Sequence, residues 1–208
     1  TGNLDKIFYR IQGIPVILHS AIKFSKNPLI DYTIVVVSKD KINITKELLN
    51  QWSVHNVMVI EGGRRRQDSA SKALSEIREN GIFKSVDLVA IHDGARPFFT
   101  QELLNKGILT AKKFKSAIPV IPVNETVKLI DKLEFVQKTL DRQLIYKSQT
   151  PQVFSLKTIT RAYKDETKNV TDDATMVELL GRKVKVFPGE YENIKITTLH
   201  DLNNSSFI

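Results

Sequence analysis

The sequence predicts an α/β domain with a mainly parallel sheet and helices on both faces, and two observations support this fold class. Short β-branched runs such as TIVVVS alternate with amphipathic segments of helical length. These runs are continuously apolar, as in strands that are buried on both faces. With 208 residues and 41% hydrophobic residues, the chain fits one domain over residues 1–208.

The expected elements follow from hydrophobic spacing, from capping residues and from glycines. Helices are predicted over 15–24 and 68–79, after Thr100 over 101–114, from Ser155 to Tyr163, and from Thr171 to a stop at Gly181. Strands are predicted over 33–38, 57–60, 87–91, 116–123, 184–187 and 193–196. Ligands of parallel sheets bind beyond the carboxyl ends of the strands. We therefore expect functional residues directly after these strands.

One segment interrupts the alternation of strands and helices. TVKLID and EFVQKTL flank the turn residues Asp131 and Lys132, which predicts a β-hairpin arm over about 124–143. Two strands alone are marginally stable in water, so the arm needs a partner surface. A homodimer formed through the arm is the expectation.

Composition narrows the class of protein. The net charge of +8 favours anionic ligands such as nucleotides, phosphorylated metabolites or nucleic acid. The chain has no cysteine, and its four histidines never fall at a close ligand spacing, so a zinc site is not expected. No apolar run approaches the roughly 20 residues needed to cross a bilayer, so we expect a cytoplasmic protein without a membrane partner.

The segment GGRRRQDS, residues 62–69, connects a strand to a helix. Glycines allow a ligand to approach the backbone, arginines pair with phosphate, and a helix start offers free N–H groups. The segment could equally be a turn in which Asp68 caps the helix and the arginines are solvated.

Two further residues have ambiguous roles at this stage. Asp93, in HDGARPF, follows a buried strand and could hold Mg²⁺ against phosphates, or could be a turn residue paired with Arg96. Lys195, in NIKI, would project from one face of a strand. It could stabilise a phosphoryl transition state or protect a sheet edge.

Taken together, several segments resemble the 2-C-methyl-D-erythritol 4-phosphate cytidylyltransferases of the non-mevalonate isoprenoid pathway. They are GGRRRQDS, HDGARPF, PVNETVK, TLDRQLIYKSQTPQVF, TDDATMVELLG and GEYENIKIT, in the order and spacing of that family. The resemblance runs from Lys6 nearly to Leu202. It implies a Rossmann-like nucleotidyltransferase fold, transfer of CMP from CTP to the sugar-alcohol phosphate, Mg²⁺ as cofactor, and a homodimer whose β-arm is exchanged.

The resemblance also implies roles for individual residues. Lys6, Lys195 and Arg142 would be catalytic; Gly62, Gly63, Ser69 and Gly94 would line the cytidine pocket; Arg96, Thr126, Arg142 and Thr171 would hold the sugar phosphate; and Asp93 would bind Mg²⁺. Thr126 and Arg142 lie on the expected arm, so they would serve the site of the partner subunit.

The family begins with a strand and a glycine-rich loop of the form AAGxGxRM, which wraps the triphosphate. The present sequence starts after that segment, at TGNLDK. We expect an N-terminal strand and glycine-rich loop to precede it in the full protein. Around Lys6, DKI stands where the family usually has PKQ.

Two alternatives compete with this interpretation. A ribitol 5-phosphate cytidylyltransferase would perform the same chemistry, but its motifs usually contain HDSVRPF and PNR where this chain has HDGARPF and LDR. A basic nucleic-acid-binding module would fit the net charge. However, the sequence has no aromatic-rich binding strand and no arginine-rich tail, so nucleic acid is not the expected partner.

Overall fold

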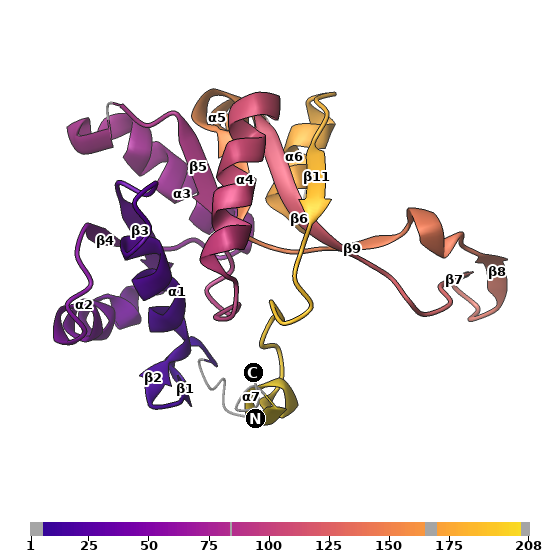
Figure 1. The fold of residues 1–208 in the computed structure, drawn as a ribbon, viewed down its shortest axis with the longest axis horizontal. Helices are drawn as coiled ribbons and strands as arrows, with labels where there is room; N and C mark the ends of the chain where they lie inside the picture. The colour runs from indigo at the N-terminus through magenta and orange to yellow at the C-terminus, as the bar shows by residue number, and fades with distance from the viewer. Residues whose placement is uncertain (1–5, 84, 165–169, 205–208) are drawn as a thin grey trace.

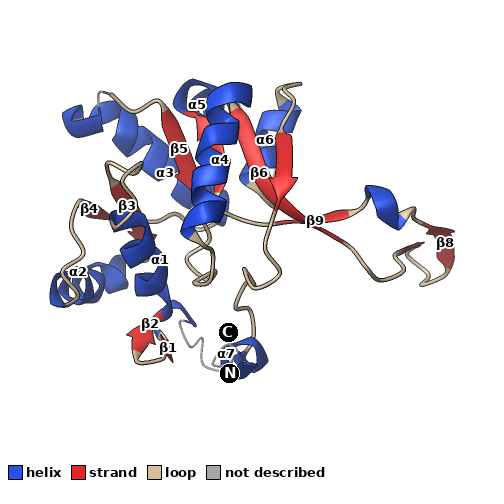
Figure 2. Cartoon of the chain, viewed as in Figure 1, coloured by secondary structure: helices blue, strands red, loops and turns tan. Residues whose placement is uncertain are grey.

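A computed structural model describes residues 6–83, 85–164 and 170–204 (Figures 1 and 2). The helices are α1 Val16–Ser25, α2 Ile42–Gln51, α3 Arg66–Glu79, α4 Gln101–Phe114, α5 Leu156–Lys164, α6 Asp173–Leu179 and α7 Leu199–Asn204, with short 3-10 turns at Lys6–Phe8, Lys39–Lys41, Gly81–Phe83 and Arg142–Leu144. The strands are β1 Arg10–Ile11, β2 Ile14–Pro15, β3 Thr33–Val37, β4 Val57–Glu61, β5 Leu88–Ile91, β6 Ser116–Pro122, β7 Lys128–Ile130, β8 Val136–Thr139, β9 Tyr146–Ser148, β10 Gln152–Ser155 and β11 Lys185–Pro188. Within the described ranges, no helix is long and apolar enough to cross a membrane.

The main sheet has the strand order β11-β6-β10-β5. β11 is parallel to β6, whereas β10 lies antiparallel to both β6 and β5, so β5, β6 and β11 share one direction. The predicted α/β class is confirmed. The sheet is mixed because β10, which was not predicted as a strand, inserts between β5 and β6, and because the fifth strand, β9, pairs antiparallel with β6.

Alternation of side chains on β10 builds the core on both faces of the sheet. Val153 packs with Leu104 and Ile108 of α4, whereas the next residue, Phe154, packs with Ile159 of α5 and with residues of α3 and α6. Helices therefore cover both faces, as a strand buried on two sides requires. The sheet is therefore held between two apolar layers.

β3 and β4 form a separate parallel pair, with Thr33 opposite Val57 and Val37 opposite Glu61. Apolar residues of α1 and α2 cover this pair. Among the described residues, β3 pairs only with β4, and β5 pairs only with β10. A cavity of about 600 Å³ lies between β3 and β5, lined by side chains of both strands, α1 and α3.

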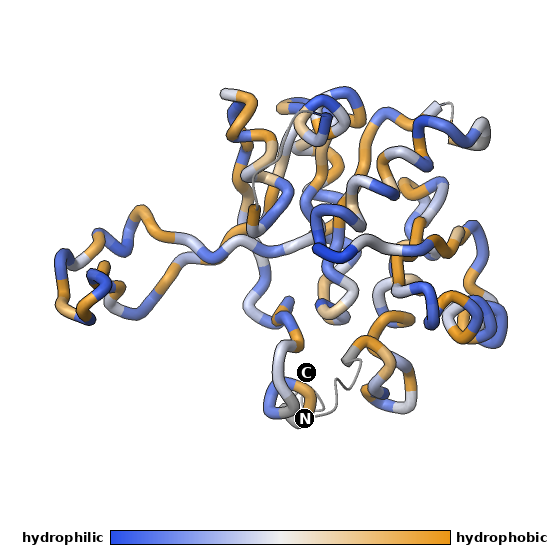
Figure 3. The backbone as a smooth tube through the Cα atoms, turned by 180° about the vertical axis from the view of Figure 1, so that it is seen from behind, coloured by the Kyte–Doolittle hydropathy of each residue, from blue (hydrophilic) through white to orange (hydrophobic). Residues whose placement is uncertain are grey.

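The arm protrudes from the rest of the chain (Figure 1). β7 and β8 pair antiparallel, and the Asp131 carboxylate accepts hydrogen bonds from the backbone N–H groups of Leu133 and Phe135 in the turn. The predicted hairpin is therefore present. Its tip carries exposed apolar side chains, with Leu133 77% and Phe135 70% exposed, and the hydrophobic residues there are visible as orange stretches in Figure 3.

Most predicted elements are present, but three details differ. α3 begins at Arg66 with Arg65 as its N-cap, while Asp68 bonds back to the Arg65 backbone from inside the helix. α6 is capped by Asp172 rather than by Thr171, because the Asp172 carboxylate reaches the backbone N–H of Thr175.

The third difference is that residues 193–196 are not a strand. Their backbone N–H groups donate to carbonyls outside any strand pairing: Asn193 to Glu190, Ile194 to Glu192, and Ile196 to Ala95. The buried Asn193 side chain competes for backbone partners by donating to the Thr150 carbonyl. The alternating apolar pattern of NIKI thus reflects one-sided packing of a loop.

Thr100 is expected to matter for stability as a helix cap and as a loop anchor. Its hydroxyl accepts from the backbone N–H of Leu103 and donates to the Glu190 carboxylate, which also accepts the Thr100 N–H. Thr100→Val should lower the free energy of unfolding by about 1–2 kcal/mol, measured by urea denaturation. Thr100→Ser keeps the hydroxyl and is the control. Equal stability of the two variants would contradict the capping role.

Candidate active site

Asp93 lies two residues after the end of β5 and is surrounded by three cations from different segments. Its Oδ1 lies 3.1 Å from Nε of Arg66, while Oδ2 lies 3.1 Å from Nζ of Lys195 and 3.4 Å from Nε of Arg96. The Asp93 side chain is only 12% exposed. A carboxylate in this position is the electrostatic centre of the site.

The surrounding cations keep Asp93 ionised. Burial alone would raise the pKa of its carboxyl group, but the charges of Lys195 and Arg66 outweigh burial and lower that pKa to about 2. The described residues contain no cluster of three or more histidine and acidic side chains that could hold a metal ion. An ionised carboxylate such as that of Asp93 is the kind of ligand that Mg²⁺ takes together with phosphate oxygens and water.

A hydrogen-bonded chain supports Asp93 from behind. The Asp93 N–H donates to Oγ1 of Thr150 at 3.1 Å, and Thr150 Oγ1 lies 3.0 Å from Nδ1 of His92. Nε2 of His92 lies 3.0 Å from the carbonyl oxygen of Arg96, which can only accept, so Nε2 carries the proton. Nδ1 is then an acceptor for the Thr150 hydroxyl. These hydrogen bonds fix the backbone of the loop that carries Asp93.

His92 also packs between two aromatic rings. Its ring centroid lies 5.3 Å from that of Phe24 and 4.6 Å from that of Phe99, with edge-type geometry. Burial lowers the pKa of His92 to about 4, because it outweighs the charge of Asp93 and the hydrogen bond to the Arg96 carbonyl, both of which raise that pKa. His92 is therefore neutral at physiological pH and supports the loop by hydrogen bonding.

The loop that carries Lys195 is fixed by buried amides. The carbonyl of Asn193 accepts from Arg96 Nη1 at 2.8 Å, and the Asn193 side chain donates to the Thr150 carbonyl at 2.9 Å. Gln149 bonds the backbone of Glu190 through both its amide oxygen and its amide nitrogen. Lys195 thus reaches Asp93 from a loop rather than from the expected strand.

Two cavities meet at this site. The cavity between β3 and β5 is bordered by Ser69 and Gly94, which were predicted to face cytidine. A second pocket of about 220 Å³ is bordered by Arg96, Thr171 and Lys195, which were predicted to face the sugar phosphate or the transition state. Asp93 and Arg66 border both cavities.

The glycine segment after β4 is tightly folded against the start of α3. The N–H of Gly63 donates to Ser69 Oγ at 3.0 Å, and Lys72 Nζ donates to the Gly62 carbonyl at 2.8 Å. A Cβ at position 63 would lie 2.3 Å from Cβ of Asp68. Glycine is therefore required here to bring Ser69 toward the cavity.

Arg66 lies beside Asp93, although the sequence interpretation considered the arginines of GGRRRQDS only together, as possible phosphate partners, and gave Arg66 no individual role. It belongs to the arginine run of GGRRRQDS, but its neighbour Arg65 instead pairs with Asp68 at the surface. Arg66 contacts both Asp93 and the fully buried Asp173. The helical position of Arg66, on the same side as Ala70 and Ala73, which border the larger cavity, is the only sequence signal that could have separated it from Arg65.

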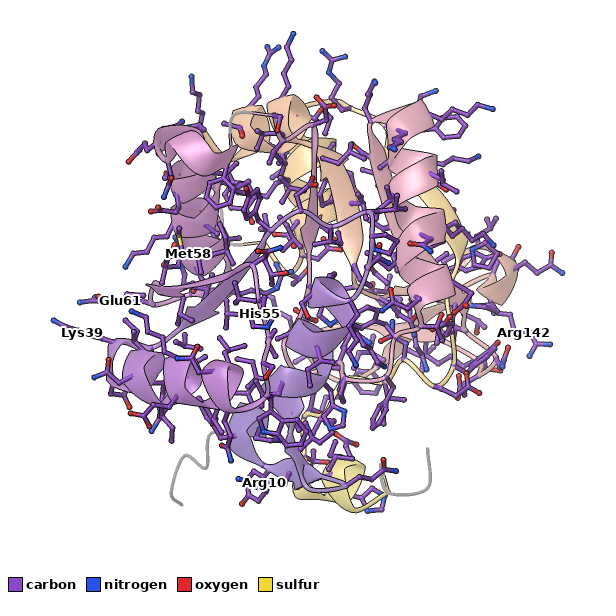
Figure 4. The ribbon with its side chains drawn as sticks, turned by 60° about the vertical axis from the view of Figure 1, so that its left-hand side comes forward. Arg10, Lys39, His55, Met58, Glu61 and Arg142 are labelled. Atoms are coloured by element: carbon purple, nitrogen blue, oxygen red, sulfur yellow. The ribbon has the colours of Figure 1, made fainter. Side chains whose placement is uncertain are left out.

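Three predicted residues are not brought to Asp93 within this chain. Thr126 and Arg142 are exposed on the arm, where Arg142 Nη1 donates to the Asn124 carbonyl. Figure 4 shows the Arg142 side chain at the outer edge of the molecule. The backbone of Lys6 lies in a 3-10 turn, but its side chain is outside the described part of the structure.

Comparisons with known proteins identify close relatives. The family model of 2-C-methyl-D-erythritol 4-phosphate cytidylyltransferase matches residues 1–208. Enzymes of that name from Dehalococcoides mccartyi and Clostridium beijerinckii are 41% and 38% identical, each over 97% of this chain and over 86% and 88% of their own lengths. The crystal structure of 4-diphosphocytidyl-2C-methyl-D-erythritol synthase from Anaerococcus prevotii has a TM-score of 0.86 and 34% identity, covering 95% of this chain and 87% of that one.

The lowered pKa of His92 predicts a loss of stability in mild acid. Between pH 6.5 and about 4 the unfolded chain protonates this imidazole and the folded chain does not, so the free energy of unfolding should fall as the pH falls. We expect a loss of about 2 kcal/mol, less than the full pKa difference would give because His92 also borders a cavity.

Urea denaturation at pH 7, 5.5 and 4.5 measures this loss. The variant His92→Gln keeps a donor but does not titrate, so its stability should depend less on pH over this range. An identical pH dependence of the two proteins would show that His92 is protonated equally in the folded and unfolded states.

Proposed function

Because the chain belongs to the 2-C-methyl-D-erythritol 4-phosphate cytidylyltransferase family, we propose that it transfers the CMP part of CTP to 2-C-methyl-D-erythritol 4-phosphate and releases pyrophosphate. The observation that carries this proposal is the ionised Asp93 among Arg66, Arg96 and Lys195 at the junction of two cavities. Such a site can hold two phosphorylated substrates and one divalent cation.

The reaction is an in-line displacement. A phosphate oxygen of the sugar-alcohol phosphate forms a bond to the α-phosphorus of CTP, and the bond from that phosphorus to the pyrophosphate oxygen breaks. No covalent enzyme intermediate is needed, so positioning and charge neutralisation supply the catalysis. Lys195 would neutralise charge that develops on the α-phosphate, and Lys6 would do the same from the N-terminal side.

Binding roles follow the two cavities. Arg96 and Thr171 border the smaller pocket and would hold the phosphate of the sugar alcohol. Ser69 and Gly94 border the larger cavity and would contact cytidine, with Gly62 and Gly63 letting the nucleotide approach the backbone. Asp93 would hold Mg²⁺, which when bound would withdraw charge from the triphosphate.

The arm supports a homodimer in which each subunit completes the other's site. Its exposed apolar tip includes Leu133 and Phe135, and a two-stranded hairpin needs such a surface to be covered. Thr126 and Arg142 are both exposed on this arm, and Figure 4 shows the Arg142 side chain at the outer edge of the molecule. Both would therefore bind the sugar phosphate in the partner's pocket.

A further strand between β3 and β5 would complete the sheet. Both strands have a free edge among the described residues, and the cavity between them is lined by apolar side chains such as Val36, Leu88 and Ala90. A strand there would end at the carboxyl edge of the sheet, beside Asp93. The glycine-rich loop expected from the family would then lie where the triphosphate needs backbone N–H groups.

Substrate choice tests the proposed function. Incubation of the protein with CTP, Mg²⁺ and either 2-C-methyl-D-erythritol 4-phosphate or ribitol 5-phosphate should release pyrophosphate with the first and about 100-fold less with the second, because the longer polyol does not fit the same contacts. Pyrophosphate is measured by a coupled assay. Preferential release with ribitol 5-phosphate would instead support the alternative cytidylyltransferase.

Subunit mixing tests the exchanged arm. Lys195→Ala and Arg142→Ala should each lower turnover by about 100-fold, since each removes one preorganised phosphate contact. In a mixed dimer, one site contains both Lys195 and Arg142, so mixing the two variants should restore up to a quarter of wild-type activity.

Subunit exchange is verified with differently tagged chains. The absence of recovery after verified exchange would show that both residues act within one chain, or that Arg142 lies outside the site.

A further inference from the structure

Arg66 has a set of contacts that the other two cations around Asp93 lack. Its Nε donates to Asp93 at 3.1 Å, and its Nη2 donates to Asp173, which lies at the start of α6. Arg96 instead donates its second hydrogen bond to the carbonyl of Asn193, and Lys195 forms an ion pair with Asp93. Within the described ranges, Arg66 is the one cation of the three that pairs with a second carboxylate.

Asp173 is built as an anchor for this guanidinium. Its side chain is fully buried, one carboxylate oxygen accepts from the Tyr163 hydroxyl, and the other accepts from Arg66. Burial first, and then the charge of Asp173, raise the pKa of Tyr163, so the hydroxyl remains a donor. Burial disfavours the Arg66 cation, but the carboxylates of Asp173 and then of Asp93 together outweigh burial and raise the pKa of Arg66.

The ion pair with Asp173 would hold Arg66 in place if a ligand displaced its contact with Asp93. A divalent cation on Asp93 would compete with the guanidinium for the same carboxylate oxygens. Arg66 would then lose its contact with Asp93 but keep its contact with Asp173. The freed Nε–H would still point toward the junction, where a phosphate oxygen could accept it.

The position of Arg66 between the two cavities indicates which phosphate group would accept this hydrogen bond. Ser69 and Gly94, which border the larger cavity, are the proposed cytidine contacts, and Arg96 and Thr171, which border the smaller pocket, are the proposed sugar-phosphate contacts. Arg66 borders both. The group of CTP that connects the nucleoside with the attacking substrate is its α-phosphate.

We propose that Arg66 is a further catalytic residue that binds the transferring α-phosphate of the nucleotide, and that Asp173 and Tyr163 are positioning residues that aim it. This inference rests on the proposed function, because it takes CTP as the nucleotide. A guanidinium suits the role, since its planar fork can bind a carboxylate with one edge and a phosphate with another. The ammonium group of lysine lacks this rigid, planar set of donors.

Nucleotide binding is the sharpest test, because it does not require turnover. The affinities of CTP and of cytidine are measured for the wild-type chain, for Arg66→Lys, and for the double variant Arg66→Gln/Asp173→Asn, which replaces the buried ion pair by neutral hydrogen-bonding groups. Arg78→Lys is the matched control: Arg78 lies in the last turn of the same helix and pairs at the surface with Glu79.

Both Arg66 variants should weaken CTP binding by about tenfold or more, whereas cytidine affinity should stay within about twofold of wild type, because only CTP carries the phosphate. Turnover at saturating substrates should fall by about 100-fold. Tyr163→Phe, which removes one hydroxyl, should also weaken CTP binding and lower turnover, but by less than the Arg66 variants.

Three results would overturn the proposal. CTP affinity that is unchanged in both Arg66 variants would show that the guanidinium does not bind phosphate. Equal losses for CTP and cytidine would show a general distortion of the site and a structural role for Arg66. A wild-type chain that binds no CTP would refute the proposed function itself and this inference with it.

Discussion

The carboxylate of Asp93 organises the charged end of the sheet. Three cations that come from α3, from the loop after β5 and from the loop before α7 converge on it. Without that anion, Arg66, Arg96 and Lys195 would repel one another at short range in a partly buried site. The same arrangement prepares the site for phosphates, because the cations are already placed when an anionic substrate arrives.

Neutral hydrogen bonds hold this charged cluster in place. His92 and Thr150 fix the backbone of Asp93, while Asn193 and Gln149 fix the loop of Lys195. Buried amides and a neutral imidazole can do this without adding charge that would disturb the cluster. The positions of Asp93 and Lys195 therefore depend on hydrogen bonds made by uncharged neighbours.

Local patterns made much of the fold and part of the site predictable. Continuous apolar runs identified β3, β4, β5 and β6, and Thr100 identified the start of α4, because these signals lie within a few neighbouring residues. Asp93 was recognisable from its place after a strand. By contrast, β10 and the loop around Asn193 depend on partners about 40 residues away or farther, such as Ala90 and Thr150.

The contacts of Arg66 could not be predicted for the same reason. In the sequence it is one of three consecutive arginines, and in the folded chain its pairings with Asp93 and Asp173, which are 27 and 107 residues away, distinguish it from Arg65. A buried carboxylate next to a helix cap gives no local signal of its partner. Long-range ion pairs of this kind require the folded chain to be seen.

In the described part of the chain, β3 and β5 do not pair with each other, and this has a consequence for cooperativity. The β3–β4 pair with α1 and α2 has its own apolar core, and the sheet from β5 to β11 has others. α1 and α3 bridge the two parts, through Phe24 and Leu74. With few shared contacts, the two parts should exchange their amide hydrogens as separate units, and the β3–β4 part should open more readily. A strand paired with both edges would merge them into one cooperative unit.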